Sequence, residues 1–261
     1  MEINQSRRFG GVARLYGDEG LAAFEQAHVL VAGLGGVGSW AAEALARSAV
    51  GELTLVDFDH IAESNVNRQL HAVEGEFGKS KVQAMTERLL LINPQLKINV
   101  IDDFLTPENM SEHLGQGAKK SKAVQFHNFV VLDATDDVKM KTALAAYCRK
   151  DIPLIICGGA GGKLDPSRIS AEDLTKTTQD PLLSKIRYNL RKEHGFTSDP
   201  KKKFQITAIY SDEPRQGVSS GGLACSGYGS AVTVTATFGF VAAAEALKII
   251  KKNYLKSLKP A

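Results

Sequence analysis

The sequence predicts an α/β fold: an open, mainly parallel sheet of Rossmann type with helices on both faces and a long C-terminal helix. Three observations support it. Short apolar, β-branched runs alternate with helix-forming segments between residues 28 and 157. A glycine-rich turn joins the first of these apolar runs to a segment rich in helix-forming residues. The composition, 43% hydrophobic and 23% charged over 261 residues, excludes a disordered or fibrous chain.

The strands and helices are expected in strict alternation. Four apolar runs have the length of buried strands, and one segment alternates like a strand: residues 28–33, 53–57, 129–133 and 154–157, and residues 97–101. Helices are expected over residues 21–27, 39–47, 79–92, 139–150 and 231–258. The helix over 79–92 should stop at Asn93 and Pro94, because proline disfavours a helical residue before it.

We predict a single domain with three parts. These are an N-terminal helical arm over residues 1–27, a nucleotide-binding core over 28–162, and a substrate-side and C-terminal helical region over 163–261. Regularity fades after residue 162, where short helices and an exposed loop at Lys201–Lys203 are expected. The C-terminal segment is strongly apolar only over residues 231–244, short of the roughly 20 residues that a spanning helix needs. We therefore expect a buried helix there and leave membrane contact open.

Charge and cysteine content limit the function classes. The net charge of +3 permits a nucleic-acid partner without establishing one. The three cysteines are odd in number and form no C-x-x-C pair, which argues against a disulfide framework and against zinc. The first fourteen residues are polar and charged, without the apolar stretch of a secretory signal. A reducing, cytoplasmic location is expected.

The glycine-rich turn predicts a nucleotide site. Gly33, Gly35, Gly36 and Gly38 stand between a strand and a helix, where backbone N–H groups and the helix N-terminus can receive phosphate. Asp57 ends the next strand, the place where Rossmann folds hold the acid that binds ribose hydroxyls. These features fit NAD, FAD or ATP, and an NAD-dependent oxidoreductase is the first hypothesis.

The residues that follow favour ATP. Arg68 and Lys81 are suited to clamping a triphosphate, whereas the pyrophosphate of a dinucleotide carries too little charge to need both. Asp136, after the strand at 129–133, is placed to hold a Mg²⁺ ion that bridges the phosphates.

The same residues carry a resemblance to the ubiquitin-activating (E1-like) adenylating enzymes, which include the ThiF-type activators of sulfur-carrier proteins. The matching motifs lie within residues 28–137: Gly33-x-Gly-Gly-x-Gly38, Asp57-x-Asp59, Asn65-x-x-Arg68-Gln69, Gly78-x-x-Lys81, Ile92-Asn-Pro94 and Asp133-x-Thr-Asp136. The resemblance implies the E1-like ATP-binding fold. It implies that Asp57 binds ribose, that Asn65, Arg68 and Lys81 contact phosphates, and that Asp136 supports Mg²⁺. Asp59, Gln69 and Asp137 stand beside these residues and are expected in the ATP site.

Further motifs resemble the branch of that family that dehydrates threonylcarbamoyladenosine (t6A) in tRNA. They are Arg8-Phe-Gly-Gly-x-Ala-Arg14-Leu-Tyr-Gly17, the helix at 38–47, Asp102-Asp-Phe-x-Thr-Pro107, Gly158-Gly-Ala-Gly-Gly162, Gln179-Asp-Pro181 and Thr233-x-Thr-Ala-Thr-Phe-Gly-Phe240. The resemblance implies a tRNA carrying t6A at position 37 as substrate and ATP-dependent closure of its side chain to a cyclic hydantoin. The alternative is adenylation of the C-terminus of a ubiquitin-like sulfur carrier. Intact ATP residues argue against a non-catalytic scaffold.

Several expectations depend on the resemblance alone. It implies a homodimer, in which Arg8 or Arg14 completes an ATP site across the interface. It also leaves open a sulfur-transfer protein as a partner. Cys225 is expected either as a nucleophile or sulfur relay, or as a small packing residue before the last helix. Independently of the resemblance, the six histidines are scattered along the sequence, so His60 and His71 are expected in surface or hinge positions. Residues 115–128 are interpreted as an insertion.

Overall fold

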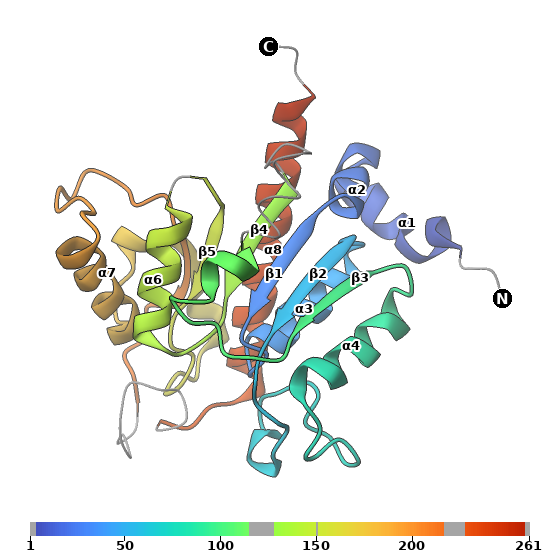
Figure 1. The fold of residues 1–261 in the computed structure, drawn as a ribbon, viewed down its shortest axis with the longest axis horizontal. Coiled ribbons are helices and arrows are strands. Elements are labelled where there is room, and N and C mark those ends of the chain that lie inside the picture. Colours follow the sequence, from blue (N-terminus) through green and yellow to red (C-terminus); the bar gives the residue numbers. More distant parts are fainter. Residues whose placement is uncertain (1–3, 115–127, 150, 217–227, 259–261) are drawn as a thin grey trace.

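A seven-stranded sheet forms the centre of the molecule (Figure 1). The computed structural model describes residues 4–114, 128–149, 151–216 and 228–258. The strand order is β3-β2-β1-β4-β5-β7-β6, and every neighbouring pair is parallel except β6 with β7. The strands are β1 (His28–Ala32), β2 (Glu52–Val56), β3 (Lys97–Ile101), β4 (Phe129–Asp133), β5 (Leu154–Cys157), β6 (Ile169–Asp173) and β7 (Thr207–Ser211).

Seven helices that have both ends in the described ranges surround the sheet. They are α1 (Gln5–Tyr16), α2 (Asp18–Glu25), α3 (Gly38–Arg47), α4 (Lys81–Ile92), α6 (Val138–Cys148), α7 (Pro181–Glu193) and α8 (Val232–Ser257). Three single-turn 3₁₀ helices connect them: η1 (Glu63–Asn65), η3 (Pro166–Arg168) and η4 (Leu174–Lys176). This arrangement confirms the predicted fold class, an open and mainly parallel sheet with a long C-terminal helix.

The predicted elements lie within a few residues of their observed bounds. Strands β3, β4 and β5 have the predicted bounds, and α4 ends at Ile92 as the following Asn-Pro pair indicated. The start of α4 is two residues later than predicted. Ser80 instead pairs with His60 in an isolated antiparallel bridge, which keeps the chain extended until Lys81.

Two strands, β6 and β7, were not predicted from the sequence. Only short helices were expected between residues 163 and 205, yet β6 lies in that range and β7 follows it. The five residues of β6 read Ile-Ser-Ala-Glu-Asp, with too few apolar side chains to stand out. Strand β7 is buried only because it lies between β5 and β6, so its burial depends on tertiary structure.

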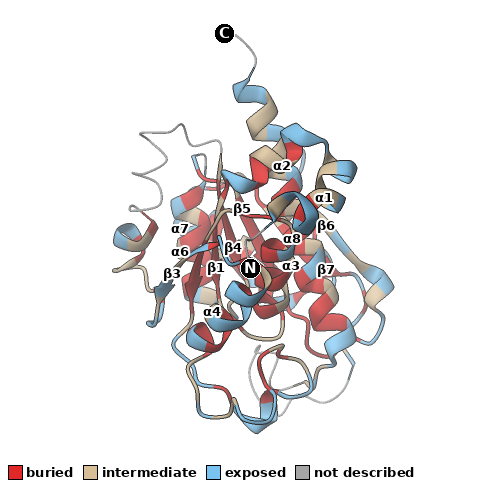
Figure 2. Cartoon of the chain, turned by 90° about the vertical axis from the view of Figure 1, so that its right-hand side faces the viewer, coloured by how far each residue is buried: buried red, intermediate tan, exposed pale blue. Residues whose placement is uncertain are grey.

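Each face of the sheet carries its own core. Helices α2, α3, α4 and α8 pack on one face, against side chains such as Val29, Val31 and Leu55. Helices α6 and α7 pack on the other face, against the alternate side chains, among them Leu30 and Val131. Figure 2 shows the buried residues concentrated along the sheet and the inner sides of these helices. A sheet buried on both faces explains why its central strands are apolar throughout.

The long helix α8 is a core element. Its buried side chains recur at helical spacing and include Val234, Phe238, Ala242, Ala246 and Ile250. In the described part of the chain it is the one helix long and apolar enough to cross a membrane, and 56% of its apolar window is buried inside the protein. The sheet and α3 pack against the apolar face of α8, so that face is not available to lipid. This agrees with the predicted buried helix.

The crossing of α3 and α8 yields a stability prediction. A Cβ at Gly239 would stand 2.5 Å from the carbonyl oxygen of Val37 and 2.9 Å from the amide nitrogen of Ala41. We expect Gly239→Ala to force the helices apart and to lower the free energy of unfolding by about 1–3 kcal/mol. Gly11→Ala is the control, because its Cβ would meet nothing closer than 3.9 Å in the helix α1. Urea unfolding of both variants tests this, and equal midpoints would contradict it.

Candidate active site

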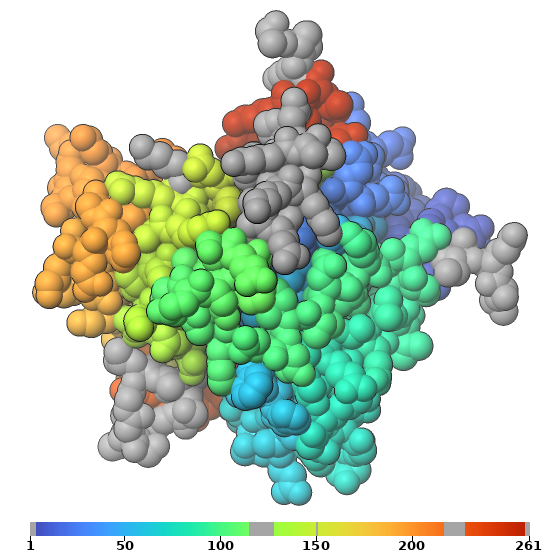
Figure 3. Space-filling view, in the orientation of Figure 1, coloured from blue at the N-terminus to red at the C-terminus, as the bar shows by residue number. Residues whose placement is uncertain are grey.

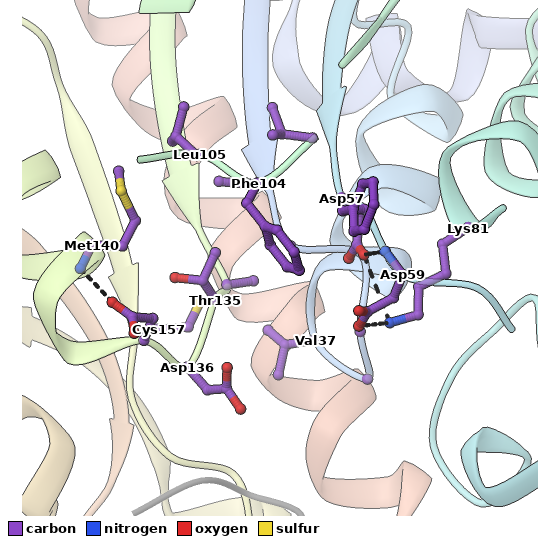
Figure 4. Close-up of a pocket in the computed structure, with 18 of the residues that line it drawn as sticks. Val37, Asp57, Asp59, Lys81, Phe104, Leu105, Thr135, Asp136, Met140 and Cys157 are labelled. Carbon is purple, nitrogen blue, oxygen red and sulfur yellow. Dashed lines mark hydrogen bonds and ion pairs between the residues drawn. The ribbon is translucent and has the colours of Figure 1, made fainter. Parts of the chain in front are cut away.

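A cavity of about 620 Å³ opens at the carboxyl end of the parallel strands. Its walls come from the segments that follow β1, β2, β4 and β5. Strands β1 and β4 are neighbours, and the chain leaves them toward opposite sides of the sheet. Ligands of open α/β sheets bind at such a switch point, and the volume is that of a small-molecule site. Figure 4 shows the side chains that meet there.

The turn between β1 and α3 comes close to the end of β4. Gly33 has φ +85°, and a Cβ at Gly38 would stand 1.8 Å from the carbonyl oxygen of Gly33. A Cβ at Gly33 would stand 3.0 Å from the backbone of Ala134 and Thr135. Because neither position has room for a side chain, backbone lines this part of the cavity. The N-terminus of α3 opens beside it, with the free N–H groups that bind phosphate in such folds.

Asp57 and Lys81 form the wall on the β2 side. Asp57 accepts hydrogen bonds from the amides of Leu34 at 2.6 Å and Asp59 at 2.9 Å. The Nζ of Lys81 lies 2.7 Å from Oδ2 of Asp59 and 3.7 Å from Oδ1 of Asp57. The Lys81 side chain is 6% exposed, so this ammonium group is held between two carboxylates at the cavity wall.

The segment after η1 places two polar side chains at the cavity. Arg68 and Gln69 line it, and the Oε1 of Gln69 is buried without a hydrogen-bond partner in the described part of the chain. The Nη1 of Arg68 donates to the carbonyl of Ser64 and to Oδ1 of Asn67, both at 2.8 Å. The Oδ1 of Asn65 instead accepts from the amide of Ala62 at 3.0 Å. Asn65 was also predicted to contact phosphate, but unlike Arg68 and Lys81 it does not line the cavity. Its side chain instead fixes the turn that precedes Arg68.

The two aspartates after β4 have different surroundings. Asp137 is the N-cap of α6, where its Oδ1 accepts the amide of Met140 at 2.5 Å. Asp136 is exposed at the cavity, and no ion pair joins it to any residue that the structure describes (Figure 4). Its carboxylate is therefore available to a cation or a ligand, whereas that of Asp137 is already engaged.

A buried ion pair that the sequence did not predict lies under the cavity. Lys141 and Asp133 are both 0% exposed, and the Nζ of Lys141 lies 3.1 Å from Oδ1 and 3.1 Å from the carbonyl oxygen of Asp133. The pair joins the end of β4 to α6. The sequence did contain an indication of this pair. Lys141 lies on the face of α6 that carries Met140, Leu144 and Cys148, and a buried lysine needs a partner because an unpaired buried charge is destabilising.

Aromatic and thiol groups complete the lining. Phe58 and Phe104 contact each other, with ring centroids 4.8 Å apart, and both line the cavity while remaining half exposed. Cys157 also lines it, and burial raises the pKa of its thiol to about 12. Cys148 is buried with a pKa likewise raised to about 12. Both cysteines are buried packing residues.

His71 corrects the expectation of a surface or hinge histidine. It is 3% exposed, and its Nε2 lies 3.0 Å from the carbonyl oxygen of Leu34 in the glycine-rich turn. Burial lowers the pKa of His71 to about 4, although the hydrogen bond to Leu34 opposes this shift. The ring is therefore neutral near pH 7 and can donate to that carbonyl. His60 is exposed, as predicted.

Two further candidates, Arg8 and Arg14, lie away from this cavity. Arg8 donates to the carbonyl of Ile92 at the end of α4, and Arg14 is exposed near the end of α1. Neither is among the described residues that line the cavity. Cys225 and most of the proposed insertion at 115–128 lie outside the described residues.

The chain is similar in sequence and in structure to known proteins, including one crystallised with ATP. The family model described as "ThiF family" matches residues 10–260. The chain is 48% identical to the tRNA threonylcarbamoyladenosine dehydratase of Haemophilus influenzae, with 96% of each chain covered. It is 44% identical to the Escherichia coli enzyme of that name, with 93% of this chain and 92% of the other covered. The crystal structure of that E. coli dehydratase in complex with ATP superimposes with a TM-score of 0.85 at 42% identity, and the full length of both chains is covered.

The buried histidine gives a pH prediction. Because its pKa falls from 6.5 to about 4 on folding, the unfolded chain binds the proton first as the pH drops. The associated stability is complete above pH 6.5 and is lost between about pH 6.5 and 4, by roughly 3 kcal/mol. We expect His71→Gln to lose this part of the pH dependence of unfolding, and His60→Gln to keep it. Identical pH profiles for His71→Gln and the wild type would contradict the prediction.

Proposed function

The chain belongs to the ThiF family, and from that premise we propose that it uses ATP to dehydrate N6-threonylcarbamoyladenosine at position 37 of tRNA to the cyclic hydantoin form. The observation that carries the proposal is similarity over nearly the full length to dehydratases of that name, at 44–48% identity. An E. coli relative has been crystallised with ATP and with AMP, which supports ATP as the nucleotide.

The reaction begins by making a carboxylate reactive. An oxygen of the t6A carboxylate attacks the α-phosphorus of ATP, and pyrophosphate leaves. The carbamoyl nitrogen of the same side chain then attacks the acyl carbon, loses its proton, and expels AMP with the former carboxylate oxygen. The net change in the nucleoside is the loss of one water. Because ring closure is intramolecular, holding the side chain in position supplies much of the rate.

The cavity provides groups suited to the ribose and the phosphates of the nucleotide. We assign the ribose hydroxyls to Asp57 and the phosphates to Arg68, Lys81 and the backbone of the turn at residues 33–38. Lys81 is already fixed beside Asp57 and Asp59. A cation held in place before the reaction stabilises the charge that develops on phosphate without reorganisation. The buried Oε1 of Gln69, which lacks a partner among the described residues, can accept a hydrogen bond from a ligand donor.

Asp136 fits a Mg²⁺ ion bound together with ATP. Its exposed carboxylate has no described ion-pair partner, and carboxylate and phosphate oxygens are the ligands that Mg²⁺ prefers. The described residues contain no group of three or more possible metal ligands, so the phosphates and water must complete the coordination. Such an ion would neutralise charge on the phosphates. Asp137 acts instead through the helix that it caps.

The alternative function has narrower support. A molybdopterin-synthase adenylyltransferase of Salmonella typhimurium is 35% identical, but the match covers 55% of this chain and 54% of the other. The similarity is thus confined to part of the chain, whereas the dehydratases match nearly all of it. Adenylation of a sulfur carrier remains the second candidate, and a sulfur-transfer partner remains a prediction. We also propose a cytoplasmic location, consistent with the two free thiols of Cys148 and Cys157.

The central prediction concerns the product. With ATP, Mg²⁺ and tRNA bearing t6A, mass spectrometry of nucleosides recovered under mild conditions should show the loss of one water. We expect Asp136→Asn and Arg68→Ala to lower the rate by about a hundredfold or more, since each removes charge stabilisation at phosphate. Arg47→Ala and Asp151→Asn, at exposed sites elsewhere, are the controls. An unchanged nucleoside despite ATP binding would overturn the proposed function.

A second prediction concerns the proposed homodimer. Arg14 lies outside the cavity of its own chain, so we propose that it reaches the ATP site of a second subunit. Arg14→Ala and Asp136→Asn should each be strongly impaired alone, whereas mixed dimers should regain activity, because one of their two sites has both residues. The test is to mix the two variants, allow their subunits to exchange, and measure the loss of water from t6A as above. Full activity of Arg14→Ala alone, or no recovery in exchanged dimers, would contradict it.

A further inference from the structure

Positive charge is concentrated in one segment of the chain. Residues 174–205 contain eight lysines and arginines but only three acidic residues, while the whole chain has a net charge of only +3. The remainder is therefore net negative. Of the three acids, Asp180 is buried and caps α7, and the Oδ1 of Asp199 accepts the amide of Lys201. Glu193, at the end of α7, is the remaining exposed acid of the segment.

Helix α7 has two distinct faces. Its inner face is apolar and buried: Leu182, Leu183, Ile186 and Leu190. Its outer face presents Lys185, Tyr188 and Lys192, which lie at the i, i+3 and i+7 positions of one stripe. The Tyr188 ring is half exposed, with the ammonium groups of Lys185 and Lys192 at 5.1 and 5.8 Å from its centroid.

The loop at Lys201–Lys203 lies beside the end of this helix. Phe204, directly after the loop, is buried and packs edge-on against Phe196. The guanidinium of Arg191 lies 5.4 Å from the Phe204 ring centroid, so the helix end and the loop are held together. We call Lys185, Tyr188, Arg191, Lys192 and Lys201–Lys203 the α7 basic face. Figure 3 shows the orange segment that contains it at one end of the molecule.

The α7 basic face begins at the active-site cavity. Leu182, in the first turn of α7, lines the cavity, and Asp180 accepts the amide of Gly159 at 2.9 Å in the loop after β5. At the rise of an α-helix, Lys185 is about 5 Å and Lys192 about 15 Å along the axis from Leu182. A chain of phosphates leaving the cavity can therefore follow this helix.

The lysines near the C-terminal end of α8 are less well placed to bind an RNA that leaves the cavity. On α8, Lys251 donates to the carbonyl of Tyr16, and Lys248 pairs with Glu245. Lys256 is about 30 Å along the helix axis from Thr235, the α8 residue that lines the cavity. The C-terminal end of α8, which carries these lysines, extends away from the sheet (Figure 1).

We propose that the α7 basic face docks the tRNA substrate, with its lysines on backbone phosphates and the Tyr188 ring against an unpaired base. This inference rests on the proposed function, since it supplies that function with its RNA-binding surface. A half-exposed aromatic ring between ammonium groups suits a single-stranded nucleic acid, in which unstacked bases meet aromatic rings and phosphates meet cations. An acidic protein would need the charges but not the ring.

The test measures tRNA binding apart from catalysis. We expect the double variant K185E/K192E to weaken the affinity for tRNA bearing t6A at least tenfold and to reduce the salt dependence of binding, since fewer counterions are released. The matched control is K252E/K256E, which makes the same charge change on α8 and should bind tRNA as the wild type does. Tyr188→Ser should also weaken binding, whereas Tyr188→Phe should retain it because the stacking surface remains.

Three outcomes would overturn the proposal: unchanged affinity of K185E/K192E, equal losses in the α7 and α8 variants, or equal affinities of Tyr188→Ser and Tyr188→Phe. ATP binding, measured on each variant, should be unchanged and reports that the fold is intact. The proposed function fails differently. If wild-type protein binds tRNA through α7 but leaves t6A unaltered, the docking surface stands and the dehydratase assignment does not.

Discussion

The close approach of the turn at residues 33–38 to the end of β4 is the constraint on which the site depends. A side chain at Gly38 would overlap the carbonyl of Gly33, and one at Gly33 would press on the backbone of Ala134 and Thr135. Without those side chains, the N-terminus of α3 faces the same cavity as Asp57, Lys81 and Asp136. Each face of the sheet has its own hydrophobic core. Residues from the two faces meet at the cavity, at the carboxyl end of the parallel strands.

Charged groups around the cavity divide into two kinds. Those that are buried and paired hold the walls: Lys141 with Asp133 below β4, and Asp180 between α7 and the loop after β5. Lys163 behaves likewise, since its Nζ donates to the carbonyls of Gln179 and Ser211, and burial lowers its pKa. Asp136 is instead open to the cavity. Removing one partner of a buried pair leaves an uncompensated charge, so the buried groups named here support the site through stability. Lys81 differs from them, because it is buried and paired but lines the cavity itself.

The structure also separates residues that one motif had grouped together. The segment from Asn65 to Gln69 supplies a turn-fixing amide, a guanidinium at the cavity wall and a buried amide without a described partner. Asp136 and Asp137 are neighbours in sequence, yet one is available to a cation and the other caps a helix. Substitutions within one motif should therefore differ in effect, some acting on nucleotide contacts and others on local folding.

The sequence by itself determined the sheet core, the glycine turn and the family, because these depend on local periodicity and fixed spacing. Strands 97–101, 129–133 and 154–157 were predicted to the residue. Tertiary structure decided what depends on distant neighbours. Strand β7 is buried only between β5 and β6, His71 is buried only by contact with the turn at Leu34, and Lys141 is tolerated in a core only beside Asp133. The α7 basic face likewise became visible only when the fold placed that helix against the cavity, because charge in a sequence carries no direction until packing decides which face remains in water.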